Sequence, residues 1–237
     1  MKKVFVLFFV FITLLPLFSY TDSFSKYNEK DEWKAFFRAI KENKNKEEVD
    51  RLYSLYIASN LTDVEISRAE YNYIRYLVDN KEEDEAKLHL KKQEEAIERM
   101  EGKNDYLSSF SRLDYISSSY YITKNISKGI ENSNKTKELY SRWKDEITII
   151  ITNAWRLIYT PQIAGGSNKN AISILLPLLE EKEIISEEDL YSIYGALSTA
   201  YYNRKDYEKS KTYLELALEI YSGEPTILEL KEKLDKK

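Results

Sequence analysis

Apolar residues recur at steps of three and four positions along most of the chain after residue 30, and charged residues fill many of the positions between them. This spacing places the apolar side chains on one face of successive amphipathic helices. The clearest breaks in the pattern are Gly102, Gly165–Gly166 and Gly223. We therefore predict paired helices over roughly 31–60, 64–101, 105–145, 146–181 and 187–221, followed by a closing helix near 225–236.

The stretch from 130 to 160 is the hardest to divide into helices, because it contains neither proline nor glycine. Within it, Ile147–Thr152 consists entirely of β-branched residues, whose intrinsic preference alone would favour a strand. No partner strand is evident elsewhere in the sequence. We therefore predict that this segment is helical, since the surrounding pattern overrides local propensity.

Two segments of the chain, 113–125 and 194–206, repeat the same pattern. Each has a large apolar residue, an aliphatic residue three positions later, a serine next to that, and a tyrosine pair before a Lys-Asn or Lys-Asp turn. Internal repetition at this spacing indicates an array of similar helical hairpins. Because a hairpin buries its apolar face only against its neighbours, we expect one continuous domain rather than several.

The second copy resembles a tetratricopeptide repeat (TPR), and the resemblance extends in weaker copies over most of residues 30–222. It implies an all-α fold in which antiparallel helical hairpins stack as a right-handed solenoid with a concave groove. The matching residues are Tyr194, Leu197, Ser198, Tyr201, Ser210, Leu214 and Ala217.

The same resemblance assigns different roles to neighbouring residues. Tyr120 and Tyr201 are expected to be buried between helices, whereas the adjacent stripe is expected to line the groove and contact a partner. The Lys and Asn clamp that some chaperone-binding members use for a terminal carboxylate is missing from this stripe, which argues against that partner class. The expected groove residues are Asp114, Ser118, Tyr121, Gly195, Thr199 and Tyr202.

The segment Thr160–Asn168 resembles a Pro-x-x-Gly-Gly loop of exported bacterial TPR-like proteins. These include the T component of tripartite (TRAP) transporters, a trimer-forming protein with a proposed channel for an apolar ligand. A structural interpretation explains every residue in the loop: Pro161 ends a helix, Gly165 and Gly166 allow an unusual turn, and Ser167 or Asn168 caps the next helix. The alternative is that exposed amides at Gly165 and Gly166 bind an anion or a partner loop.

The first residues have the form of a secretory signal peptide: a basic start at Lys2 and Lys3, an apolar run over 4–18, and a polar exit. We predict a signal peptide over 1–19 and a mature domain over 20–237, in the periplasm or secreted, with an uncleaved membrane anchor as the alternative. The sequence contains no cysteine, so it offers neither a lipid-accepting cysteine nor a disulfide.

Charge and composition argue against several function classes. The chain has 36 basic and 40 acidic residues, and loss of Lys2 and Lys3 would make it more acidic still, which disfavours nucleic acid and anionic membrane as partners. The single histidine, His89, lies between Leu88 and Leu90 and is expected to be half-exposed rather than a metal ligand. We predict no metal, no cofactor and no enzymatic activity.

The sequence thus favours an exported, non-catalytic scaffold that binds a protein or peptide in a concave groove. The alternative is a transport accessory protein that encloses an apolar small molecule, with a transport component as its partner. An apolar lining would favour the small molecule, whereas a polar lining with isolated aromatic anchors would favour a protein or peptide. The oligomeric state is left open by the sequence.

Overall fold

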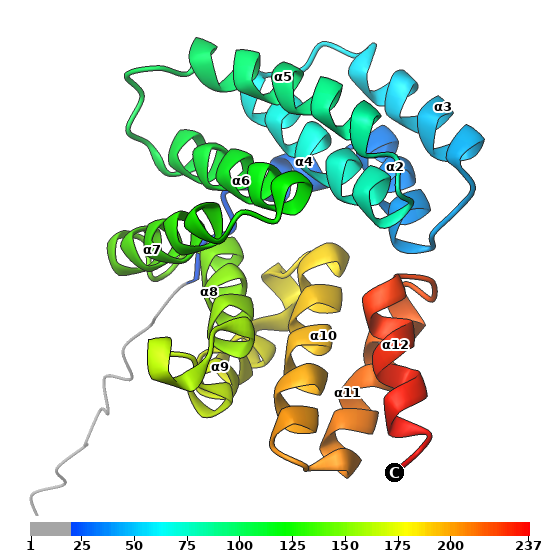
Figure 1. Cartoon of the computed structure of the whole chain (residues 1–237), viewed down its shortest axis with the longest axis vertical. Coiled ribbons are helices and arrows are strands. Elements are labelled where there is room, and N and C mark those ends of the chain that lie inside the picture. Colours follow the sequence, from blue (N-terminus) through cyan, green and yellow to red (C-terminus); the bar gives the residue numbers. More distant parts are fainter. Residues whose placement is uncertain (1–19) are drawn as a thin grey trace, which may run out of the picture.

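A computed structural model describes residues 20–237, and the predicted signal peptide lies outside this range. The described chain is all-α, as predicted, and helices follow one another from end to end (Figure 1). The α-helices are α1 (Ser25–Asn28), α2 (Asp31–Lys41), α3 (Lys46–Ile57), α4 (Asp63–Asp79), α5 (Glu83–Arg99), α6 (Tyr106–Thr123), α7 (Ile126–Arg142), α8 (Ile147–Tyr159), α9 (Asn168–Leu175), α10 (Glu187–Asn203), α11 (Tyr207–Ile220) and α12 (Pro225–Leu234). Two 3₁₀ segments are η1 (Gln162–Ala164) and η2 (Leu176–Ile184).

Apart from α1, these helices fall in the predicted ranges, and the undivided stretch from 130 to 160 breaks between Arg142 and Ile147. The β-branched run is helical because Ile147, Ile149, Ile150 and Ile151 are all buried, so tertiary packing overrides strand propensity. Pro177 lies where the helix changes type, since α9 ends just before it and the chain continues as the tighter η2.

The turns inside the helical pairs share one conformation. Each has a residue in the left-handed region, and four of the turns also carry a hydrogen bond from the next amide to the carbonyl five residues earlier: Lys44 to Ala39, Glu82 to Leu77, Gly166 to Pro161 and Asp206 to Tyr201. This is the Schellman arrangement, which satisfies carbonyls at a helix end. The left-handed residues are Asn43, Lys81, Lys124, Gly165 and Lys205.

The helices form two groups. In the first group α4 packs on both α2 and α6, with α3 and α5 outside them, and in the second α10 packs on α8, α9 and α11 (Figure 1). Between the groups, α7 rather than α6 makes the main contact with α8. The helical pairs are therefore established, whereas their stacking as a regular right-handed TPR-like solenoid stays a prediction.

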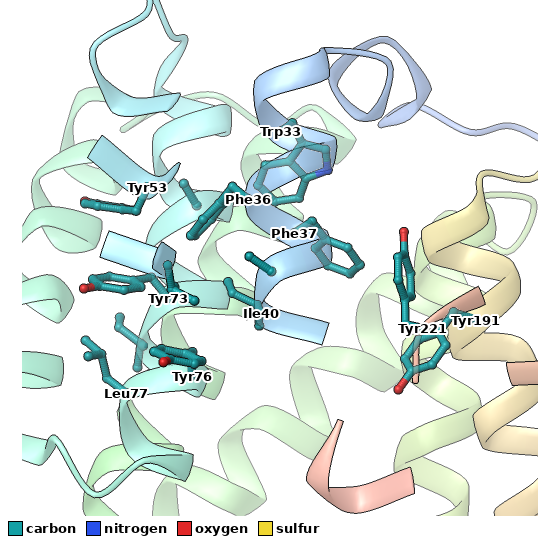
Figure 2. Close-up of a cluster of buried hydrophobic side chains, with 14 of the residues drawn as sticks. Trp33, Phe36, Phe37, Ile40, Tyr53, Tyr73, Tyr76, Leu77, Tyr191 and Tyr221 are labelled. Carbon is teal, nitrogen blue, oxygen red and sulfur yellow. The ribbon is translucent and has the colours of Figure 1, made fainter. Parts of the chain in front are cut away.

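The two ends of the helical array meet. Figure 2 shows Tyr191 and Tyr221 facing Phe37 across the main core cluster, and the Phe37 and Tyr221 ring centroids are 5.8 Å apart. Next to them, a Cβ on Gly223 would lie 2.3 Å from the Glu42 carbonyl oxygen, so only glycine fits this approach of the α11–α12 connection to α2.

The segment before α2 also belongs to the core, which the sequence pattern did not predict. The Thr21 amide donates to the Asp145 carbonyl at 2.9 Å, and the Ile147 amide donates to the Thr21 carbonyl at 2.9 Å. Phe24 is almost fully buried, with its ring centroid 5.4 Å from that of Phe110. This segment thereby connects the first group of helices to α8.

No helix within residues 20–237 combines the length and the apolar character that a membrane span requires.

Candidate binding surface

The candidate site centres on one face of α6. Asp114, Ser118 and Tyr121 are spaced four and three residues apart, so they share a face of the helix. The Asp114 side chain is buried, and Ser118 is completely buried with no hydrogen-bond partner for its hydroxyl among the described residues. Buried polar groups normally have partners, so the Ser118 hydroxyl is an exception that calls for a physical reason.

The Asp114 carboxyl is held in its neutral form by its surroundings. Burial raises the pKa of Asp114 to about 8, even though the nearby cations Arg68 and Arg75 act in the opposite direction. Within residues 20–237, neither guanidinium has a nitrogen within 4.0 Å of the Asp114 carboxyl oxygens. Arg68 pairs with Glu188 instead, and Arg75 pairs with Glu224. At neutral pH, Asp114 is therefore a carboxylic acid that can both donate and accept a hydrogen bond.

Arg75 is a cation beside Tyr121 that still reaches solvent. Its guanidinium carbon lies 5.3 Å from the centroid of the Tyr121 ring and 5.9 Å from that of Tyr71. Its contact with Glu224 is long, at 3.5 Å, and 28% of its side chain remains exposed. Arg75 therefore keeps donors available between two aromatic rings.

A second carboxylate, Glu224, anchors the α11–α12 connection over α2. It accepts a hydrogen bond from the Lys41 ammonium at 3.0 Å. Burial works against the charged form of Glu224, but Lys41 and Arg75 outweigh burial and lower the pKa of Glu224 to about 2. A small pocket beside this group is lined by Asn72, Arg75 and Asp79, among other residues.

An aromatic pair on α8 adds a flat surface. The rings of Trp155 and Tyr159 are nearly parallel, with centroids 5.5 Å apart, and 64% of Tyr159 is exposed. Trp155 is fixed in place because its indole N–H donates to the Ser192 hydroxyl at 3.0 Å. Partial burial of the ring, followed by its proximity to Tyr121 of α6, raises the pKa of Tyr159. We call Asp114, Ser118, Tyr121, Arg75, Trp155 and Tyr159 the inner polar surface.

The other three predicted groove residues serve packing within the second group of helices. A Cβ on Gly195 would lie 3.0 Å from Ile227 Cδ1, so glycine allows α10 to approach α12. The Thr199 hydroxyl donates to the Gly195 carbonyl of its own helix at 2.8 Å. The Tyr202 ring packs against Tyr207, with centroids 5.6 Å apart. None of the three joins Asp114, Ser118 and Tyr121 through a hydrogen bond within residues 20–237.

The predicted roles of the two tyrosine pairs need one correction. Tyr201 is buried and stacks on Tyr213, with centroids 5.7 Å apart. Tyr120 is not buried, since 38% of it is exposed. Its ring lies over Gly129 of α7, where a Cβ would come within 3.1 Å of it, and a glycine partner covers only one side of the ring.

The loop after α8 has the geometry of a specialised turn. Pro161 follows the end of α8 at Tyr159, and Gly165 has φ of 90° with open space around it. Gly166 has a different constraint, because a Cβ there would lie 1.7 Å from the Thr160 carbonyl oxygen. The Ser167 hydroxyl accepts a hydrogen bond from the Asn170 amide at 3.2 Å and so caps α9.

His89 is buried rather than half-exposed as predicted. Its Nδ1 lies 2.6 Å from Glu70 Oε2, and the Tyr53 hydroxyl donates to the other oxygen of the same carboxylate. A buried carboxylate needs such partners, and the sequence does not reveal that Glu70 is buried. Nowhere in residues 20–237 do three or more His, Cys, Asp or Glu side chains form a group that could hold a metal ion.

Sequence reasoning missed Arg75 and the aromatic residues of α8 that complete the inner polar surface. Arg68 and Arg75 are seven residues apart on α4, which places them on one helix face, but charged residues at that spacing are common on solvated faces too. Trp155 and Tyr159 are four residues apart on α8, a spacing that is equally common on helix faces with no binding role. Only the packing of α4 against α6 and the position of α8 show which of these residues meet.

Comparisons of the chain with protein-family models, with curated proteins and with solved structures give no match.

Proposed function

We propose that this protein is an exported, non-catalytic scaffold that binds a peptide or a protein segment on the inner polar surface. The observation that carries the proposal is the buried Ser118 hydroxyl, which has no hydrogen-bond partner within residues 20–237 and lies on the same helix face as the buried Asp114 carboxyl, beside Arg75, whose side chain is 28% exposed. A peptide backbone presents amide donors and carbonyl acceptors at regular spacing, and these are the groups that such side chains would bind.

The aromatic residues supply the apolar part of the proposed contact. Tyr121, Trp155 and Tyr159 offer ring faces within a polar setting, and interface binding energy is commonly concentrated in a few such aromatic anchors. A TPR-like stacking of the pairs would place this surface on the concave side, which supports the same assignment.

The alternative function, enclosure of an apolar small molecule in a transport system, rests on the loop at Pro161–Ser167. The chemistry of the inner polar surface favours the peptide instead, because the partly exposed Arg75 guanidinium would lose hydrogen bonds to water when an apolar ligand covered it.

Selection from a random peptide library on the purified protein tests the proposal, followed by titration calorimetry of the enriched peptides. We expect Tyr121→Ala to weaken binding by about tenfold or more, in the range typical of a central aromatic anchor. The matched control is Tyr120→Ala, which removes the adjacent ring that lies over Gly129 of α7 and should change affinity less than about twofold.

Thermal unfolding of both variants establishes that each is folded at the temperature of the titration. Failure to enrich any peptide would contradict the proposal, and so would equal binding by the wild-type protein and Tyr121→Ala.

A further inference from the structure

A second surface lies on the second helical group, between α9 and the turn from α10 to α11. It is an open cleft of about 710 Å³. Four cationic side chains line it, Lys169, Arg204, Lys205 and Lys209, and none of them belongs to the inner polar surface. We call this the α9–α11 cleft.

The charge of the α9–α11 cleft is unbalanced. Its one carboxylate, Asp206, caps α11 by accepting from the Lys209 amide, and it also pairs with the Lys209 ammonium at 3.3 Å. Across residues 20–237, no carboxylate lies within 4.0 Å of the charged groups of Lys169, Arg204 or Lys205. Three cations therefore converge without a counter-charge in a chain whose net charge is −4.

The floor of the cleft is apolar. Leu176 is 37% exposed to solvent, although η2 packs against the rest of the second helical group. Tyr201 forms the adjoining wall, with the Lys209 ammonium 5.3 Å from the centroid of its ring. An occupant that satisfies both the rim and the floor must combine negative charge with an apolar side chain.

We propose that the α9–α11 cleft is a docking site for an acidic segment of a partner protein, with a large apolar side chain seated against Leu176 and Tyr201. Inorganic phosphate would leave the apolar floor empty, and a lipid surface is too flat to enter a cleft between two helices. A peptide with acidic residues on both sides of a leucine or phenylalanine matches the charge and the depth together.

Fluorescence anisotropy with a synthetic probe tests this docking site. The probe is a short fluorescein-labelled peptide with glutamates on both sides of a central leucine pair. We expect the wild-type protein to bind it with an affinity that falls as salt is added, and Lys205→Glu or Arg204→Glu to weaken binding by about tenfold. Lys211→Glu is the matched control. It makes the same change of charge at an exposed position of α11 outside the cleft, and it should change affinity by less than about twofold.

A second pair of variants tests the apolar floor. Leu176→Asp should abolish most of the binding, whereas Leu228→Asp should not, although both leucines are 37% exposed in the wild-type protein. Absence of binding to the probe overturns the proposal, as does an equal loss in Lys205→Glu and Lys211→Glu. Equal binding of a glutamate peptide without leucines, displacement of the probe by millimolar phosphate, or preferential binding to phosphatidylglycerol vesicles would each show a simple anion or lipid site instead.

Discussion

The Arg68 guanidinium of α4 donates to the Glu188 carboxylate of α10 at 2.6 Å, across 120 positions of sequence. Both side chains are largely buried, and Glu188 also accepts from the Trp33 indole at 3.1 Å. One carboxylate thus joins α2 and α4 of the first helical group to α10 of the second. Together with the Phe37–Tyr221 and Lys41–Glu224 contacts, this contact links the two groups, and the inner polar surface takes its residues from both.

Replacing Glu188 by glutamine should therefore destabilise the protein strongly. Removing one partner of a buried ion pair leaves the other charge uncompensated, which costs about 3–5 kcal/mol. The neighbouring residue provides the control: Glu187 is exposed and lies 3.5 Å from an exposed Arg38, so Glu187→Gln should change stability by less than about 1 kcal/mol. Urea unfolding followed by circular dichroism measures both, and equal effects would show that the Arg68–Glu188 contact does not hold the groups together.

Stability should depend on pH through Asp114. The folded pKa of about 8 lies above the ordinary value of 3.8, so between these values the folded protein retains a proton that the unfolded chain has lost. The free energy of unfolding must then fall as pH rises through this window. Asp189, whose pKa is raised to about 7 chiefly by burial and by Glu188, acts in the same direction.

Asp114→Asn removes the titration while keeping a neutral side chain of similar size. We expect the free energy of unfolding of the variant to depend less on pH than that of the wild-type protein. The variant should therefore gain stability relative to the wild-type protein as pH rises from 5 to 8. Urea unfolding at those two values measures the change. An identical pH slope in both proteins would show that Asp114 is ionised in the folded state.

The recurring turn conformation makes a prediction at Lys81. Its φ of 66° is costly for a residue with a Cβ and unstrained for glycine, so Lys81→Gly should stabilise the protein by about 0.5–1 kcal/mol. Lys87→Gly, within exposed α5, should instead destabilise it by about 1 kcal/mol. Thermal unfolding of the two variants should shift in opposite directions, and a loss of stability in Lys81→Gly would contradict the turn geometry.

The two glycines of the loop after α8 should respond differently to alanine. At Gly165 the added methyl group meets open space, so the loss of stability comes only from the positive φ of the backbone and should be about 1 kcal/mol. At Gly166 the same methyl group would overlap the Thr160 carbonyl, so the loop must move and the cost should exceed about 2 kcal/mol. Chemical unfolding ranks the two variants, and the reverse order would contradict the geometry of the loop.

The approximate ranges of the helical pairs could be predicted from sequence because the signals are local. The spacing of apolar residues around Trp33 or Tyr194 repeats within each helix, and capping residues such as Asn45 and Ser186 stand next to the helices that they cap. The buried charges carry no such signal. Nothing near Arg68 or Asp114 in the sequence indicates that each is covered by another helix.

The error at Tyr120 has a similar origin. The repeat pattern predicts which face of α6 packs inward, but burial of that ring also depends on the facing residue of α7, and Gly129 is too small to cover it. The segment from Thr21 to Phe24 was missed because it is too short for a periodic pattern and is held by backbone hydrogen bonds to the chain near Asp145.

The most direct measurement of the central claim is photo-cross-linking from the inner polar surface. A benzophenone amino acid replaces Tyr159 in one preparation and Tyr120 in another, since both side chains are exposed but only Tyr159 belongs to that surface. Each protein is irradiated with a peptide enriched in the library selection, and the products are mapped by mass spectrometry. We predict an adduct from position 159 and none from position 120; an adduct from position 120 alone would place the peptide on the outside of α6 and contradict the account.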